Sequence, residues 1–165
     1  MPDLLPLATI PAAEVEALLD AAFGRDRHGR TAYRVRAGLT AIDELSFAKV
    51  EDGRLVGCIQ CWPVQLNGDD SGTLPMVMVG PVAVAPARQG MGIGHRLLER
   101  AIAAAGDGAP LMLVGDAPYY QRFGFTTART GGWRMPGPYD QARLLARGDV
   151  PLRSGILAPR VALAA

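Results

Sequence analysis

Lysine, histidine and cysteine are scarce in this chain of 165 residues, and each scarcity excludes a kind of site. Lys49 is the single lysine and lies far from the chain's glycine-rich loop, which excludes a P-loop of the form G-x-x-x-x-G-K-S/T. His28 and His95 are the only histidines, and Cys58 and Cys61 are the only cysteines. The histidines and cysteines do not provide the two pairs of ligands that a zinc site needs, so we expect no bound metal.

An excess of charge of one sign is also missing. The chain has 17 basic and 16 acidic residues and a formal net charge of +1, so we expect no nucleic-acid partner. No apolar run reaches the ~18 residues of a membrane span, and the start Met1-Pro2-Asp3 lacks the basic region of a signal peptide. We therefore expect a cytoplasmic protein with no membrane partner. The length suits one globular domain over residues 1–165.

The two cysteines spell C-x-x-C, a spacing found in redox and zinc sites. Residues 54–64, however, predict a strand, in which positions three apart point to opposite faces. No second pair of cysteines or histidines completes a zinc site. We therefore interpret Cys58 and Cys61 as two buried strand residues.

The most informative stretch is an apolar run at 77–84 that leads into a glycine-rich loop and then a helix. Apolar residues recur at helical spacing from Ile93 onward, and Gly106 stands where a helix often ends. Glycines and the first N–H groups of a helix form a phosphate site, to which Arg88 adds a guanidinium. A dinucleotide fingerprint G-x-G-x-x-G fits poorly, because Leu97 stands where its last glycine belongs. A plain glycine-rich turn is the other interpretation.

Two segments of the chain resemble a known family. Gln89-Gly90-Met91-Gly92-Ile93-Gly94 is similar to the Q/R-x-x-G-x-G/A signature of the GNAT superfamily of acetyl-CoA-dependent N-acyltransferases. The later stretch 111–125 places Tyr120 four residues before Gly124, as in the Tyr-x-x-x-Gly-Phe pattern of that family, and its fuller form resembles the YhbS-like branch. The two segments together span residues 77–125, whereas both ends of the chain match loosely.

The resemblance implies a single GNAT domain of the α/β (α+β) class. Its sheet would be mixed and mostly antiparallel, with flanking helices and a splayed central pair of strands that admits the pantetheine arm of acetyl-CoA. In this chain the pair is 73–84 and 111–115, and Gly80-Pro81 in the first strand predicts a bulge or splay. GNAT proteins are often dimers, so the resemblance also allows a homodimer.

Local patterns predict the remaining elements. They are a strand at 4–10, a helix after Pro11, a helix at 31–38, strands at 45–50 and 54–64 joined by the hairpin signal Glu51-Asp52-Gly53, a helix at 139–147 and a strand at 150–164. The polar stretch 24–30 predicts a mobile, solvated loop. Because this region covers the acceptor in GNAT proteins, an alternative is that Arg25, Arg27, His28 and Arg30 contact the acceptor or CoA.

The activity implied by the resemblance is transfer of the acetyl group of acetyl-CoA to the primary amine of a small molecule or protein by direct attack. Tyr120 is the expected acid for the leaving thiolate, because a phenol stays protonated at neutral pH. A backbone N–H near Val82 or Val84 is the expected oxyanion donor. The implied cofactor-binding residues are Val82, Ala83, Val84, Arg88, Gln89, Gly90, Met91, Gly92, Ile93, Gly94, Tyr120 and Phe123.

A general base has the weakest signal in the sequence. Many GNAT proteins carry a glutamate in or near the central strand, but residues 73–84 contain no carboxylate. Asp116 is the catalytic carboxylate we favour, with Glu44, Asp43 or a water chain as alternatives, and Asp116 also suits a helix N-cap. A non-catalytic CoA-binding sensor or partner module is therefore a second hypothesis.

Overall fold

The computed structural model describes residues 4–161, which fall into two compact units. Unit 1 comprises the described residues up to 29 together with 41–61 and 80–106. Unit 2 comprises 30–40, 62–79 and the described residues from 107 onward. The chain alternates between the units because two long strands, β3 (Arg54–Gly68) and β4 (Thr73–Val84), have residues in each.

In unit 1, three strands pair antiparallel: β1 (Leu4–Pro6), β2 (Phe47–Glu51) and the first part of β3. The tip between β2 and β3 is a tight hairpin, in which Glu51 pairs with Arg54. Asp52 and Gly53 have φ of +50° and +75°, the left-handed values that a two-residue type I′ turn requires. The hairpin predicted from Glu51-Asp52-Gly53 is therefore confirmed.

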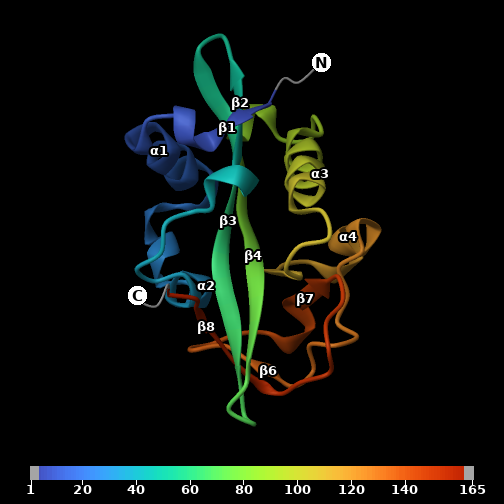
Figure 1. Cartoon of the computed structure of the whole chain (residues 1–165). Helices are drawn as coiled ribbons and strands as arrows, with labels where there is room; N and C mark the ends of the chain where they lie inside the picture. The colour runs from blue at the N-terminus through green and yellow to red at the C-terminus, as the bar shows by residue number, and fades with distance from the viewer. Residues whose placement is uncertain (1–3, 162–165) are drawn as a thin grey trace. The chain divides into compact units, whose positions relative to one another are not determined.

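Two helices of unit 1, α1 (Ala12–Phe23) and α3 (Ile93–Ala105), cover opposite sides of these strands (Figure 1). One apolar cluster joins α1 to the strands; its buried members are Leu7, Val15, Leu18, Leu19, Ala48, Leu55, Cys58 and Ala83. Gly57, one position before Cys58, faces α3 instead, since a Cβ there would lie 2.7 Å from Cγ2 of Ile93. The alternation of faces along β3 thus places one helix on each side.

Most of the segment after α1 is exposed, as predicted, but it is not an irregular loop and Arg27 is buried. It forms the 3-10 helix η2 (Arg25–Gly29), and the Arg27 side chain within it is only 2% exposed. Its guanidinium pairs with Glu16 and with Asp20, where Nε lies 3.1 Å from Oδ1. The carboxylates lie four residues apart on α1, on one side of the helix, and hold Arg27 inward. Arg27 is therefore a structural residue of unit 1, and the proposed contact of its side chain with acceptor or CoA is wrong.

The strands of unit 2 form a mixed arrangement. The first part of β4 pairs parallel with β5 (Leu111–Val114), and β5 pairs antiparallel with β7 (Leu144–Arg147). The later part of β3 pairs antiparallel with β8 (Gly155–Pro159), which pairs parallel with β6 (Trp133–Arg134). The parallel ladder joins Val77 to Leu111 and Met78 to Met112, while β4 continues to Val84. Gly80 has a φ of +126°, so the backbone of β4 is irregular at the position where the sequence predicts a bulge or splay.

The helices of unit 2 are short: α2 (Thr31–Val35) and α4 (Ala117–Tyr120), followed by the 3-10 turn η5 (Gln121–Phe123). The helix predicted at 139–147 is wrong, because this stretch forms only the turn η6 (Gln141–Arg143) and then β7. Three consecutive buried residues, Leu144 to Ala146, pair with β5 and override the local helical pattern. The last predicted strand, 150–164, contains β8, and its final residues lie outside the described range. Within residues 4–161, no helix has the length and apolarity to cross a bilayer.

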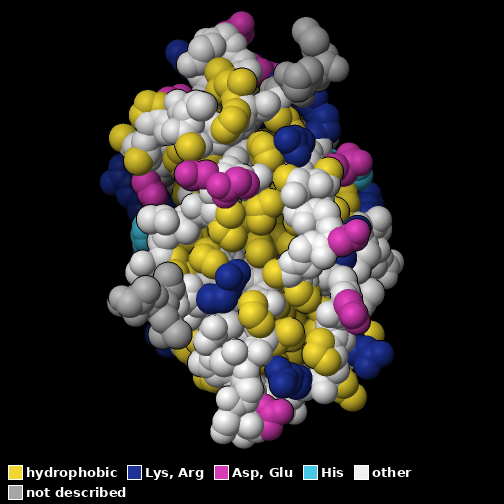
Figure 2. All heavy atoms as spheres, in the orientation of Figure 1, with side chains coloured by type: hydrophobic (Ala, Val, Ile, Leu, Met, Phe, Trp, Pro, Cys, Tyr) yellow, Lys and Arg dark blue, Asp and Glu magenta, His cyan; other side chains and the backbone are white. Residues whose placement is uncertain are grey.

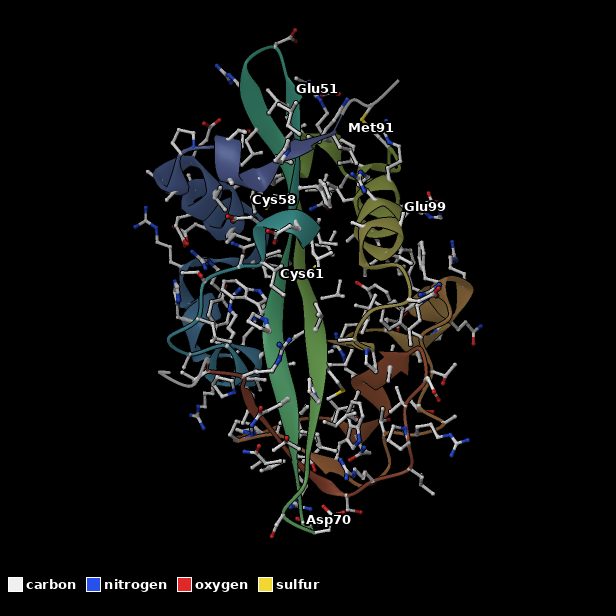
Figure 3. All side chains as sticks on the ribbon, viewed as in Figure 1. Glu51, Cys58, Cys61, Asp70, Met91 and Glu99 are labelled. Atoms are coloured by element: carbon white, nitrogen blue, oxygen red, sulfur yellow. The ribbon has the colours of Figure 1, made fainter. Side chains whose placement is uncertain are left out.

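Both cysteines lie in β3 of unit 1 as buried, free thiols (Figure 3), as the strand pattern predicts. Burial raises the pKa of Cys58 and of Cys61 to about 12. Because the thiolate is the reactive form, we expect neither thiol to react with iodoacetamide in the folded protein at about pH 8. Intact mass spectrometry should show no adduct in buffer and two adducts in denaturant. A native adduct forming as fast as on a free cysteine would contradict this prediction.

Candidate functional site

The glycine-rich loop of unit 1 has the backbone conformation that an anion cradle requires. Gly90 and Gly92 have φ of +82° and +81°, values that side chains with a Cβ rarely adopt. Gly92 is also the N-cap of α3, so the loop ends where the helix presents N–H groups without intrahelical partners. Gly90, Met91 and Gly92 are exposed, and Met91 is 66% exposed, so the loop is open to a ligand from solvent.

The end of β4 is packed closely against the start of α3. A Cβ on Gly94 would lie 3.7 Å from Cγ1 of Val82 and 3.7 Å from Cγ2 of Val84, which is ordinary contact. Ala83 points the other way and is fully buried in the cluster with α1. The predicted residues Val82 to Gly94 therefore form one continuous structure in unit 1, with a small residue needed at position 94.

Arg88, the predicted phosphate ligand, is held by a residue that the sequence pattern did not indicate. Its Nε donates to Oε1 of Glu51 at 2.7 Å, and both side chains are partly exposed. The Gln89 side chain makes a longer contact, 3.4 Å from Nε2 to the carbonyl of Val84. Glu51 stands 37 positions before Arg88 in the chain, so only the folding of the β2–β3 hairpin brings the two together.

Tyr120 lies at the end of α4 in unit 2, with its ring directly against the backbone of Gly115. A Cβ on Gly115 would lie 2.8 Å from Cδ2 of Tyr120, so only glycine leaves room for the ring. The rings of Tyr119 and Phe125 also contact it, with centroids 4.9 Å and 6.3 Å away. Burial, and to a lesser degree the nearby Tyr119, raises the pKa of Tyr120. The phenol is therefore protonated at neutral pH.

Asp116 and Phe123 occupy the two ends of the same segment. Asp116 is the N-cap residue of α4, and its backbone oxygen accepts from the N–H of Tyr120 at 3.0 Å. The predicted helix start is confirmed, but the Asp116 side chain is exposed and makes no capping hydrogen bond. The Phe123 ring contacts Tyr119 at 5.6 Å, and its carbonyl accepts from Nε of Arg147 at 2.9 Å. These contacts hold the segment that carries Tyr120.

The two other candidate bases, Asp43 and Glu44, lie on the 3-10 turn η3 (Asp43–Leu45) of unit 1. Both are exposed, and Figure 2 shows acidic side chains gathered at this turn. The structure gives neither residue a contact that would single it out as a base. Among residues 4–161, no group of three or more histidine, cysteine or acidic side chains is placed to hold a metal ion.

The sequence predicted site residues in the glycine-rich loop and in the segment of Tyr120, but not the residues that contact them, such as Glu51 and Gly115. The loop residues and β4 end lie in unit 1, whereas Asp116, Tyr120 and Phe123 lie in unit 2. Gly115 carries a weak signal, because a glycine ending a buried strand often marks a close approach. The pairing of Glu51 with Arg88 has no signal in a single sequence.

Comparison with known proteins identifies the family. Residues 43–127, more than half of the chain, match the model of the acetyltransferase (GNAT) domain. The uncharacterized N-acetyltransferase YjhQ of Escherichia coli is 29% identical over 134 residues, which cover 78% of this chain and 71% of YjhQ.

Comparison with solved structures leads to the same family. YhbS from Escherichia coli, a GNAT family N-acetyltransferase in complex with CoA, superposes with a TM-score of 0.69 at 22% identity, covering 92% of this chain and 86% of YhbS. A GNAT family acetyltransferase from Brucella melitensis in complex with acetyl-CoA has a TM-score of 0.63 at 30% identity, covering 91% and 90%. The mixed α/β fold predicted above is thereby confirmed, and the chain belongs to the GNAT family of N-acetyltransferases.

Proposed function

We propose that this protein transfers the acetyl group of acetyl-CoA to the primary amine of a small molecule or a protein. The observation that carries the proposal is the loop Gln89 to Gly94, with left-handed glycines that lead into the N-terminus of α3. Such a loop suits the pyrophosphate of CoA, because N–H groups and the helix dipole both favour negative charge. The complexes of YhbS with CoA and of the Brucella protein with acetyl-CoA support the same ligand.

The proposed chemistry is direct attack of the neutral amine on the thioester carbonyl. The new C–N bond forms a tetrahedral oxyanion, for which a backbone N–H near Val82 or Val84 is the proposed donor. Collapse breaks the C–S bond, and the thiolate takes the hydroxyl proton of Tyr120. The proton lost by the amine passes to water or to an exposed carboxylate, among which Asp116 is our choice.

The test of ligand identity is a thermal-shift titration with acetyl-CoA, CoA and NAD in parallel. A ligand that binds only the folded state raises Tm by mass action, by several degrees at about 100 times its Kd. We expect a rise with acetyl-CoA and CoA and none with NAD. No rise with either CoA species at about millimolar concentration would contradict the proposal.

The second candidate is a CoA-binding module without turnover, which the lack of a carboxylate in β4 favours. Release of free thiol from acetyl-CoA across a library of primary amines separates the two functions. Turnover with any amine above the hydrolysis background supports the enzyme, whereas CoA binding without turnover across amines, amino acids and peptides supports the module.

A further inference from the structure

Glu51 and Arg88 are brought together by two rigid parts of unit 1. Glu51 is the last residue of β2 and is followed at once by the two-residue turn at Asp52 and Gly53, which fixes its backbone. Arg88 ends the 3-10 turn η4 (Pro86–Arg88), and its N–H donates to the carbonyl of Ala85 at 2.8 Å. Figure 3 places Glu51 and Met91 at the same end of this unit. The ion pair therefore joins the hairpin tip to the start of the glycine loop.

The geometry of the pair leaves part of the guanidinium available. Only Nε of Arg88 contacts Glu51, at 2.7 Å from Oε1. Within residues 4–161, no hydrogen bond or ion pair engages the two terminal nitrogens of Arg88. Those nitrogens form the planar fork that binds a phosphate through parallel N–H bonds. A carboxylate on Nε thus orients the side chain without occupying that fork.

We propose that Glu51 is a positioning residue that holds the Arg88 guanidinium ready for a phosphate of CoA. This inference rests on the proposed function, because it takes the loop at Gln89 to Gly94 as the CoA site. A flexible arginine loses rotamer freedom when it binds a ligand, and a side chain already held in place loses less. Glu51 also carries a negative charge that repels the phosphate, so its useful feature is the acceptor oxygen on Nε.

Two neutral variants separate orientation from charge. Glu51→Gln and Glu51→Ala both remove the charge, but only glutamine keeps an oxygen that accepts from Nε of Arg88. By isothermal titration we expect Glu51→Ala to bind CoA about two- to fivefold more weakly than Glu51→Gln, since the loss is limited to that of one partly exposed contact. Glu51→Gln should bind at least as tightly as the wild type. Equal Tm values for the two variants would show that folding is unaffected.

The same comparison in an Arg88→Ala background provides the control, because the residue at position 51 then has no guanidinium to orient. The affinity ratio between the Glu51→Ala and Glu51→Gln variants should fall to about one. Equal CoA affinity of the two variants with Arg88 present would overturn the inference, and so would a ratio that persists without Arg88. Equal and tighter binding by both variants would mean that Glu51 competes with the phosphate instead, which also overturns it. Absence of CoA binding by the wild type would instead overturn the proposed function itself.

Discussion

Replacing Tyr120 by phenylalanine is expected to lower kcat about a hundredfold while leaving the affinity for CoA nearly unchanged. The phenylalanine ring keeps the packing against Gly115, Tyr119 and Phe125 but has no proton to give to the thiolate. Thiol-release kinetics with the best amine acceptor, together with titration of CoA, measure both quantities. Tyr119→Phe is the matched control, since it removes a hydroxyl from the adjacent ring and should change kcat by less than about threefold.

The pH dependence of Tyr120 has a definite sign. Burial raises its pKa above the ordinary value of 10.0, so the proton stays on the phenol throughout the neutral and mildly alkaline range. Activity that depends on this proton should not decline with rising pH until above that value. A wild-type kcat that falls through an apparent pKa near neutrality, with a fall that Tyr120→Phe removes, would contradict the assignment.

Position 115 offers a second way to disturb the same ring. Gly115→Ala keeps the phenol but places a methyl group 2.8 Å from Cδ2 of Tyr120, so the ring must move. Since a displaced acid is poorly aligned, kcat should fall while CoA still binds. Retention of full activity in both Tyr120→Phe and Gly115→Ala would rule out Tyr120 as the acid.

Replacing Gly92 by valine is expected to weaken CoA binding about a hundredfold or more, the loss expected for one or two charge-assisted hydrogen bonds. Gly92 has a φ of +81°, which costs a residue with a Cβ about 1–2 kcal/mol and a β-branched residue more. The loop must therefore refold locally, and its N–H groups no longer converge on one phosphate. Isothermal titration with CoA gives the affinity, and circular dichroism checks that the protein remains folded.

Gly94→Ala is the matched control for this loop. Its Cβ would lie 3.7 Å from the nearest atoms of Val82 and Val84, and position 94 needs no left-handed backbone. We expect the alanine variant to fold normally and to bind CoA within about threefold of the wild type. If the Gly92 variant also keeps wild-type affinity, the loop is not the phosphate site.

Local sequence determined those features whose causes lie within a few residues. The hairpin at Asp52-Gly53 follows from turn chemistry, and β4 has the bounds predicted for it, Thr73–Val84. Helix α3 spans Ile93–Ala105 and is followed by Gly106 as its C-cap, as its apolar spacing and C-terminal signal predict. The loop before α3 needs glycine at positive φ, and the alternating glycines of its sequence predict this backbone conformation.

Tertiary structure decided the features that depend on residues far apart in the chain. The stretch 144–147 has a local pattern that suits a helix, yet its pairing with β5 makes it a strand. The local sequence predicts that Arg27 is solvated, but in the folded protein its side chain is buried and pairs with two carboxylates of α1.

The candidate site divides in the same way. Sequence alone indicated the loop residues and Tyr120, because the roles proposed for them rest on backbone conformation and on one phenol. Gly115 packs against a ring five residues later, and Glu51 pairs with an arginine 37 residues later. Propensities and motifs report on neighbours along the chain, whereas a contact such as that of Glu51 with Arg88 exists only once the strands have paired.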